Sequence, residues 1–229
     1  MNLDSLTTLD KELLLALNGS QSVFLDSVVK TLTATATWIP LYVSMLYVVL
    51  KNSDTMRRVL TIVCCAAVCV LLAGTIDDTL VKPLVARWRP ARDGEIGVLV
   101  DIVNGYRGGR FGFFSAHASN TFSIAVFFSL LVRNRTFTIT MVTWSLLNCW
   151  TRLYLGVHYP GDIVCGLLWG ALVGTGVWYA YHRLVPKGQT PPNFISSQYT
   201  STGFQRSQLD AVTTVFILTI IFAFIKACF

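Results

Sequence analysis

Charged side chains are scarce in this sequence. Asp, Glu, Lys and Arg make up 13% of its 229 residues, while hydrophobic residues make up 53%. A typical soluble domain is about 25% charged, and the few charges here are clustered between long uncharged runs. A bilayer imposes this arrangement on the helices that cross it. The composition therefore predicts an integral membrane protein, and a soluble bundle with unusually apolar helices is the alternative.

Sequence patterns that bind metals or form disulfides are also missing. The chain has three histidines and six cysteines, and no two cysteines form a CxxC pair. The cysteines lie in or beside apolar runs, which is typical of small buried apolar residues. We therefore expect no metal site, no disulfide framework and no cofactor.

Six runs without a charged residue predict about six transmembrane helices. They cover residues 31–50, 59–76, 118–132, 136–151, 163–181 and 211–225. A spanning helix needs about 20 apolar residues, so the shorter runs are expected to extend into their flanks. Residues 1–18 mix acidic residues with leucines and lack the basic start of a cleavable leader, which predicts an amphipathic helix on the membrane surface. The expected fold is all-α, with residues 1–229 in one membrane-integral domain.

The connections between the runs sort onto two sides, because successive spanning helices alternate in direction. Residues 51–58, 133–135 and the flexible loop 182–210 share one side, whereas 77–117 and 152–162 share the other with both termini. The first side carries eight basic residues against two acidic ones, which predicts that it is cytoplasmic. The second side is also basic, but several of its cations belong to the candidate site below. These loops and an anionic substrate explain the net charge of +6 without a nucleic-acid partner.

The first candidate cluster is Lys82-Pro-Leu-Val-Ala-Arg-Trp-Arg89-Pro90. In a helix, a separation of seven residues places Lys82 and Arg89 two turns apart on one face, and Pro90 ends the segment. Two cations on one face beside a membrane form a site for an anion. The alternative is that both side chains extend from a helix end to the lipid headgroups.

The second cluster is Ser115-Ala116-His117, directly before the third uncharged run. A serine and successive backbone N–H groups at a helix start form a cradle for phosphate, and the helix dipole adds attraction for negative charge. His117 stands where a histidine could donate a proton to a leaving group. The alternative for His117 is a hydrogen-bonded histidine at the membrane interface.

The third cluster is Arg152-x5-His158-x3-Asp162. Pro160 and Gly161 break the chain before the fifth run, which places Asp162 in the first turn of that helix. There its carboxylate can accept a hydrogen bond from one ring nitrogen of His158 and leave the other nitrogen free as a nucleophile. Arg152 presents a planar fork of donors to phosphate oxygens. The alternative is that Asp162 only caps its helix.

The three clusters, taken in this order, resemble the signature of the type 2 phosphatidic acid phosphatase superfamily, in its bacterial membrane-integral branch. The matching patterns are Lys-x6-Arg-Pro, Ser-x-His and Arg-x5-His-x3-Asp. The resemblance covers residues 82–162. The family usually has Pro-Ser-Gly-His where this chain has Phe-Ser-Ala-His, and Ala116 keeps the backbone N–H but has less torsional freedom than glycine. Thr151 replaces the usual serine before the third motif and keeps the hydroxyl group. The resemblance implies a helical bundle and a metal-independent membrane lipid phosphatase.

The resemblance also implies a role for each residue of the motifs. His158 attacks phosphorus and forms a phosphohistidine, Asp162 orients His158, and His117 protonates the leaving oxygen. The residues that hold the phosphoryl oxygens are Lys82, Arg89, Ser115, Arg152 and Ala116, the last through its backbone N–H. No cofactor is implied.

The substrates that the resemblance implies are lipid phosphates and diphosphates. Undecaprenyl diphosphate or a lipid A phosphate is expected first, with phosphatidic acid and phosphatidylglycerol phosphate as alternatives. The expected location is a bacterial inner membrane with the site facing the periplasm, and the partners are the lipid substrate and the bilayer, with no obligate protein partner.

Three other classes of protein are alternatives. A vanadium-dependent haloperoxidase has a similar anion pocket but is soluble, and a membrane scaffold would not need His158 beside Asp162. A membrane anion transporter could also place arginine and histidine near the bilayer. It would typically show internal repeats or broken helices, and the sequence predicts neither.

Overall fold

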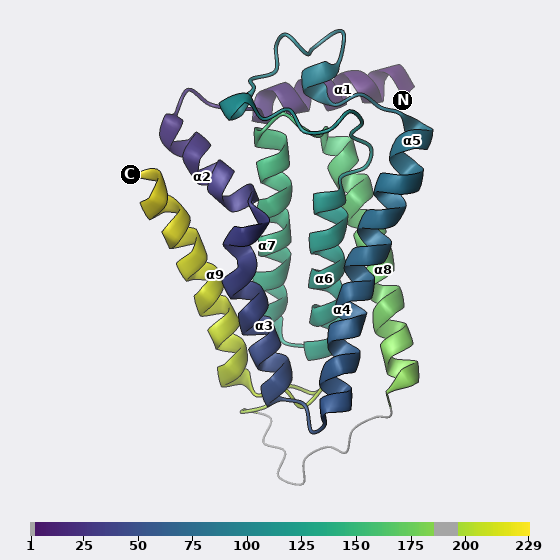
Figure 1. Ribbon diagram of the computed structural model, residues 1–229, viewed down its shortest axis with the longest axis vertical. Coiled ribbons are helices and arrows are strands. Elements are labelled where there is room, and N and C mark those ends of the chain that lie inside the picture. The colour runs from purple at the N-terminus through teal and green to yellow at the C-terminus, as the bar shows by residue number, and fades with distance from the viewer. Residues whose placement is uncertain (1–2, 186–196) are drawn as a thin grey trace.

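The computed structural model describes residues 3–185 and 197–229, and these residues form helices and no β-strand. Long helices run side by side, while α1 (Leu3–Leu17) lies across one end of the bundle (Figure 1). The bundle contains α2 (Val23–Thr33), α3 (Ile39–Lys51), α4 (Met56–Ile76), α6 (Ala116–Val132), α7 (Arg135–Tyr154), α8 (Pro160–Leu184) and α9 (Arg206–Ala227). Each predicted run coincides with one of these helices, except that the first is divided between α2 and α3. The predicted all-α membrane bundle is confirmed.

Length and hydropathy identify the clearest membrane spans. Among the described residues, three helical segments are long and apolar enough to cross a membrane, namely Met56–Val85, Pro160–Leu184 and Arg206–Ala227, and the bent pair α2 and α3 adds a fourth if it forms one span. α6 is apolar but has only 17 residues, and α7 is more polar. Their hydroxyl groups bond within the bundle, as between Thr121 and Ser145 at 2.8 Å. The expected count of about six therefore includes two helices that lack the length or the hydropathy of the others.

The first predicted run contains a break that the sequence did not predict. α2 ends at Thr33, and a 3-10 turn over Thr35–Trp38 leads into α3 at an angle of 68°. The indole Nε1 of Trp38 donates to the carbonyl oxygen of Leu32 at 2.8 Å across this break. Pro40 is the signal in the sequence for a new helix start, because proline fits the first turn of a helix and not its interior.

The most extensive helix contact in the bundle is between α6 and α8. Glycines recur at every fourth position of α8 and face the backbone of α6: Gly166, Gly170 and Gly174. A Cβ atom on any of them would lie within 2.8 Å of a carbonyl oxygen, so the helices approach as closely as only small residues permit. The facing oxygens belong to Ser115, Ser119 and Ser123. The contact brings the starts of α6 and α8 together, where the backbone N–H of Ser115 donates to the carbonyl oxygen of Asp162 at 3.1 Å.

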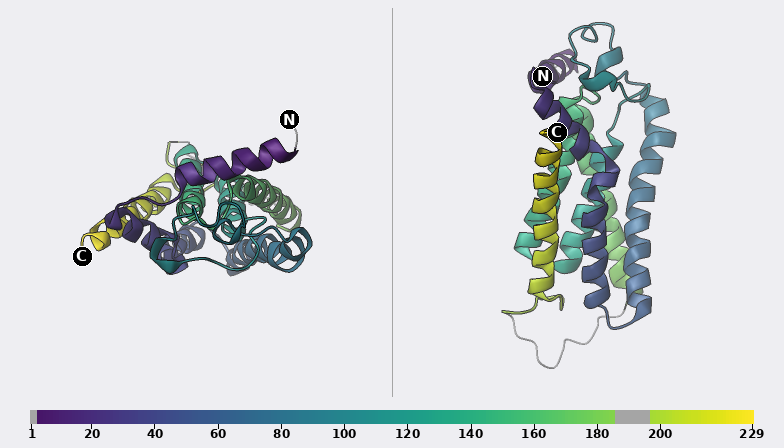
Figure 2. Two further views of the ribbon diagram at one scale, coloured as in Figure 1. Left: turned by 90° about the horizontal axis from the view of Figure 1, so that it is seen from above. Right: turned by 60° about the vertical axis from the view of Figure 1, so that its left-hand side comes forward.

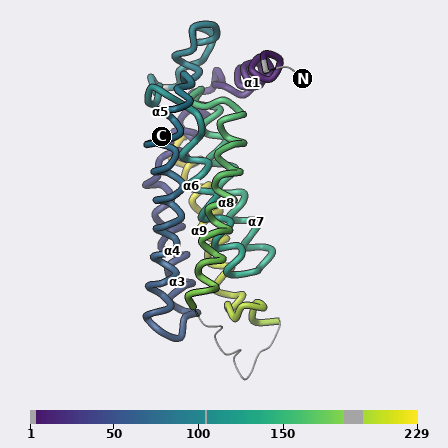
Figure 3. Tube along the Cα trace, turned by 90° about the vertical axis from the view of Figure 1, so that its right-hand side faces the viewer, coloured from purple at the N-terminus to yellow at the C-terminus, as the bar shows by residue number. Residues whose placement is uncertain are grey.

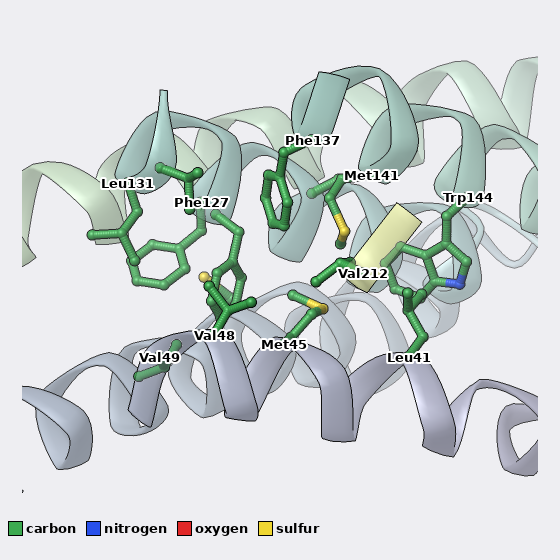
Figure 4. Close-up of a cluster of buried hydrophobic side chains, with 14 of the residues drawn as sticks. Leu41, Met45, Val48, Val49, Phe127, Leu131, Phe137, Met141, Trp144 and Val212 are labelled. Atoms are coloured by element: carbon green, nitrogen blue, oxygen red, sulfur yellow. The ribbon is translucent and has the colours of Figure 1, made fainter. Parts of the chain in front are cut away.

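An apolar core fills the bundle between α3, α6, α7 and α9. Figure 4 shows buried side chains of these helices pointing toward one another. They include Leu41, Met45, Phe127, Phe137, Met141, Trp144 and Val212. Trp38, at the break before α3, stacks on Phe216 of α9 and meets Trp144 edge-on. The core therefore anchors the broken helix to its neighbours.

The two ends of the bundle carry different connections, as predicted. α1, the segment 77–115, the turn 155–159 and the end of α9 lie at one end, while the α3–α4 and α6–α7 connections lie at the other (Figures 1 and 3). α8 runs to Leu184 and α9 begins at Arg206, so the helices include part of the predicted loop 182–210. Residues 186–196 of that loop lie outside the described residues.

α1 has the amphipathic character predicted for residues 1–18, and Figure 2 shows it lying across the end of the bundle. The leucines on its outer side are each between 42% and 48% exposed: Leu6, Leu9, Leu13 and Leu17. Leu14, in contrast, is fully buried in a cluster with Tyr159 at the start of α8. One side of the helix therefore packs on the bundle, and the other presents leucines to the surroundings.

The close contact between α6 and α8 can be tested with a matched pair of glycines in α8. We expect Gly170→Ala to lower the free energy of unfolding in detergent by about 1–3 kcal/mol, because the added methyl group forces the two helices apart. Gly176 has nothing within 4 Å of the position where its Cβ would lie, so Gly176→Ala should be neutral or stabilise by up to about 1 kcal/mol. Denaturant unfolding of both variants measures the difference, and equal stability would contradict the close contact.

Candidate active site

The three predicted clusters meet at the end of the bundle that carries α1. The start of α6, the end of α7, the start of α8 and the segment that follows α4 all reach this end (Figure 1). Lys82, Arg89 and Arg152 each act electrostatically on both His117 and His158. The residues that the sequence separates by up to 80 positions therefore form one group.

Lys82 is held by two aspartates at the end of α4. The helix continues through a π-helical turn, Asp77–Val81, whose backbone bonds join residues five apart. The Lys82 Nζ atom lies 2.8 Å from Oδ2 of the buried Asp77 and 2.5 Å from Oδ1 of Asp78. Asp77 Oδ1 also accepts a hydrogen bond from the backbone N–H of Phe114 at 3.1 Å. Asp77, which sequence reasoning missed, therefore fixes the Lys82 ammonium group beside the segment that leads into α6.

Lys82 and Arg89 do not lie on one helix face, so that prediction is wrong. The short helix α5 (Lys82–Val85) ends where Ala86 adopts a left-handed conformation with a φ of 49°. The backbone of Arg89 is extended, a conformation that Pro90 favours because proline disfavours a helical residue before it. The two cations therefore reach the site from two different segments, a short helix and an extended stretch.

The guanidinium group of Arg89 is buried against the ring of His158. Its Nη1 atom lies 3.2 Å from His158 Nε2 and donates to the carbonyl oxygen of Val157 at 3.1 Å. Its Nε atom donates to the carbonyl oxygen of Phe111 at 3.1 Å. A guanidinium group can only donate, so Nε2 of His158 accepts with its lone pair, and the ring proton is on Nδ1.

Asp162 lies in the first turn of α8, as predicted, and both of its carboxylate oxygens have partners. Oδ2 accepts from the backbone N–H of Tyr159 at 3.0 Å, and Oδ1 lies 2.9 Å from Nη1 of Arg87. Oδ2 also lies 3.5 Å from Nδ1 of His158, which is a close contact and not a full hydrogen bond. The carboxylate thus caps its helix, as the alternative predicted. It faces Nδ1 of His158, but the predicted hydrogen bond to the ring is not formed in this structure.

His158, in the turn between α7 and α8, is surrounded by positive charge. Burial lowers the pKa of His158 well below the ordinary range, and Arg89, Arg152 and Lys82 lower it further. The imidazole ring is therefore neutral at neutral pH. A neutral nucleophilic nitrogen thus lies next to several cations, where an anion would be attracted.

The second motif forms the predicted helix start. Ser115 is the buried N-cap of α6, and its Oγ atom accepts from the backbone N–H of Ala118 at 3.4 Å. Ala116 and His117 are the first two helical residues, and N–H groups in this turn have no acceptor within the helix. The arrangement offers the backbone donors that bind anions at helix starts.

Arg152, in the last turn of α7, is held by two hydroxyl groups that sequence reasoning missed. Its Nη1 atom donates to Oγ1 of Thr33 at 2.8 Å, and its Nη2 atom donates to the phenol oxygen of Tyr106 at 3.1 Å. Its Nε atom has no hydrogen-bond partner among the described residues. Thr33 and Tyr106 are 119 and 46 positions from Arg152, so no local pattern marks them.

A cavity of about 540 Å³ opens beside Arg152 and the side chain of His117. Its walls include Lys30 and Thr33 at the end of α2, the residues at the break before α3, and Tyr106. The break in the first predicted run therefore shapes the site as well as the bundle.

The cations of the site are compensated in two ways. Lys82 and Arg87 pair with carboxylates. Within the described part of the chain, Arg89 and Arg152 hydrogen-bond only to neutral atoms. Their charges remain available for an anion that binds in front of His158 Nε2. No group of three or more His, Cys, Asp or Glu side chains among the described residues could hold a metal ion.

Two known proteins are similar to this chain over most of its length. A lipid A 4'-phosphatase of Bacteroides thetaiotaomicron is 40% identical to this chain over 189 residues, which cover 82% of this chain and 84% of that protein. A lipid A 4'-phosphatase of Porphyromonas gingivalis is 32% identical over 209 residues, which cover 90% of this chain and 88% of that protein. No solved structure matches the chain.

A family model describes the same region. Residues 62–186, more than half of the chain, match the model of the PAP2 superfamily. All three motif clusters, from Lys82 to Asp162, lie within this match. The chain therefore belongs to the PAP2 superfamily.

Proposed function

We propose that this protein removes a phosphate group from a lipid A phosphate through a phosphohistidine at His158, without a metal. The family and the two relatives establish the coarser statement, that the chain is a membrane phosphatase. The observation that carries the mechanism is the state of His158. Its ring is buried and neutral, and its Nδ1 faces the carboxylate of Asp162, which is how a third group orients a histidine nucleophile. Its Nε2 atom carries the lone pair and lies beside the Arg89 guanidinium group, which would bind a phosphoryl oxygen at that position.

The first step transfers the phosphoryl group to the enzyme. His158 Nε2 forms a bond to phosphorus while the bond from phosphorus to the lipid oxygen breaks, and the electron pair of that bond leaves with the oxygen. His117 gives this oxygen a proton, and the negative charge of the bound phosphoryl group favours the protonated form of His117 beforehand. Asp162 stabilises the positive charge that the His158 ring acquires.

The second step releases the phosphate. His117, which is now neutral, takes a proton from a water molecule as the water oxygen attacks phosphorus. The bond between phosphorus and His158 Nε2 breaks, and its electron pair returns to the ring. Inorganic phosphate leaves, and the enzyme is restored.

Positive charge and N–H donors hold the phosphoryl oxygens in both steps. The proposed groups are the side chains of Lys82, Arg89, Ser115 and Arg152 and the backbone N–H of Ala116. Arg89 and Arg152 bring charge that no carboxylate pairs with, and stabilisation of developing negative charge is a major source of catalysis. Ala116 has ordinary helical torsions, so its N–H is available here without the freedom of the glycine that is usual in the family.

The cavity supports a substrate with a bulky polar headgroup. Its volume of about 540 Å³ is in the range of sites that hold drug-sized molecules, and it is larger than a phosphate group alone requires. Lys30, Thr33 and Tyr106 supply polar groups along it. Together with the names of the two relatives, this favours a sugar-containing lipid A phosphate over undecaprenyl diphosphate, phosphatidic acid or phosphatidylglycerol phosphate.

The proposed location is a bacterial inner membrane with the site on the periplasmic side. The connections 51–58, 133–135 and 182–210, which are predicted to share the side opposite the site, carry eight basic residues against two acidic ones, and the positive-inside rule assigns such a side to the cytoplasm. A reporter fused after Asn134 should therefore report the cytoplasm, and one fused after Gly105 the periplasm. Topology reporters active only in one compartment measure this, and a cytoplasmic signal after Gly105 would reverse the orientation.

The substrate proposal is tested by phosphate release from a panel of lipids. In detergent with EDTA, we expect the purified protein to act on lipid A with a higher kcat/KM than on undecaprenyl diphosphate, phosphatidic acid or phosphatidylglycerol phosphate. His158→Ala should release no phosphate, because the nucleophile is gone. His182→Ala changes the remaining histidine of the chain, at the far end of α8, and should be fully active. Activity that EDTA abolishes and a divalent ion restores would contradict the proposal.

The role of His117 is tested by changing the leaving group. An alkoxide is a strongly basic leaving group that must be protonated as it leaves. His117→Ala should therefore slow phosphoenzyme formation from lipid A by about 10²–10⁴-fold. A nitrophenolate leaves readily without a proton, so the loss with p-nitrophenyl phosphate should be much smaller. Single-turnover measurements with both substrates separate this step from hydrolysis, and an equal loss on both would mean that His117 only binds phosphate.

A further inference from the structure

An aspartate of α1 reaches the start of α8, far from its own place in the sequence. Asp10 Oδ1 accepts a hydrogen bond from the backbone N–H of Gly161 at 2.7 Å. Asp10 Oδ2 lies 2.6 Å from Nη2 of Arg87. Asp10 is partly buried and lies on α1 between the exposed leucines and the buried Leu14. None of the three sequence motifs includes Asp10.

Arg87 bridges Asp10 to the site. Its Nη1 atom lies 2.9 Å from Oδ1 of the fully buried Asp162, while its Nη2 atom pairs with Asp10. The guanidinium group also lies on the face of the Tyr159 ring, 3.9 Å from the ring centroid. The planar fork and the ring together fix the orientation of Arg87, which a lysine ammonium group could not reproduce.

We propose that Asp10 and Arg87 are positioning residues of the proposed phosphatase reaction, on which this inference rests. Arg87 holds Oδ1 of Asp162, so that the other oxygen, Oδ2, is presented to Nδ1 of His158. Asp10 holds Arg87 and the first turn of α8 in turn. The surface helix α1 is then a functional part of the active site.

Charge gives Asp10 a role beyond holding the chain in place. One guanidinium group and two carboxylates leave the group Asp10, Arg87 and Asp162 with a net charge of −1. His158 becomes positively charged when it is phosphorylated, among cations that disfavour this charge. The net negative charge of this group, next to Nδ1, stabilises the positive charge of the phosphorylated ring against the repulsion from the cations. This attraction is stronger in a partly buried site than in water. Without the charge of Asp10, Arg87 neutralises Asp162, and the group no longer stabilises the positive charge of the phosphorylated His158 ring.

The test compares two substitutions that make the same chemical change in α1. Asp10→Asn keeps an oxygen that accepts from Gly161 but removes the charge that pairs with Arg87. Glu12→Gln removes the charge of an exposed acid two residues away. With lipid A as substrate, we expect Asp10→Asn to lower kcat about tenfold and to leave KM within about twofold of the wild type. Glu12→Gln should match the wild type in both constants.

A double-mutant cycle separates positioning from a general structural effect. If Asp10 acts through Arg87, the double variant Asp10→Asn/Arg87→Lys should be no slower than Arg87→Lys alone. Additive losses, or a kcat for Asp10→Asn equal to that of Glu12→Gln in an active protein, would overturn this inference and leave the proposed function intact. A wild-type protein that releases no phosphate from any lipid would overturn the proposed function and this inference with it.

Discussion

The close contact between α6 and α8 is the interaction on which the site depends. Apolar surface gives little drive for helix association inside a bilayer, so packing and hydrogen bonding must hold the helices together. Gly166, Gly170 and Gly174 let the two backbones approach, and the N–H of Ser115 donates directly to the carbonyl oxygen of Asp162. Ser115 leads into His117, and Asp162 in the first turn of α8 faces His158 in the turn before this helix. The proposed acid and nucleophile are therefore positioned by a single helix pair.

The distribution of charge is the second organising feature. Two cations, Lys82 and Arg87, pair with carboxylates and hold segments of chain in place. Arg89 and Arg152 are held by neutral oxygen atoms, so their positions are fixed while their charges are uncompensated. This division lets a positively charged site exist before substrate binds, and pre-organised charge of this kind favours the transition state of phosphoryl transfer.

The sequence predicted what depends on local patterns. Uncharged runs located the helices. The second and third motifs correctly predicted that Ser115 precedes the start of α6 and that Asp162 lies in the first turn of α8. The prediction that Lys82 and Arg89 share a face is wrong because Ala86 turns the chain in a left-handed conformation that alanine rarely adopts. Contacts across long separations left no local pattern either. The hydrogen bond between Thr33 and Arg152 and the ion pair between Asp10 and Arg87 depend on tertiary packing. The break before α3 is different, because Pro40 could have indicated it.

The most direct test of the account is to trap the proposed intermediate on His158. The protein would be mixed with lipid A that carries labelled phosphate, quenched in alkali, in which phosphohistidine survives, and digested for mass spectrometry. The account predicts labelled phosphate on the peptide that contains His158 within one turnover, and none in His158→Ala. Rapid phosphate release with no labelled enzyme, or label on a different residue, would contradict it.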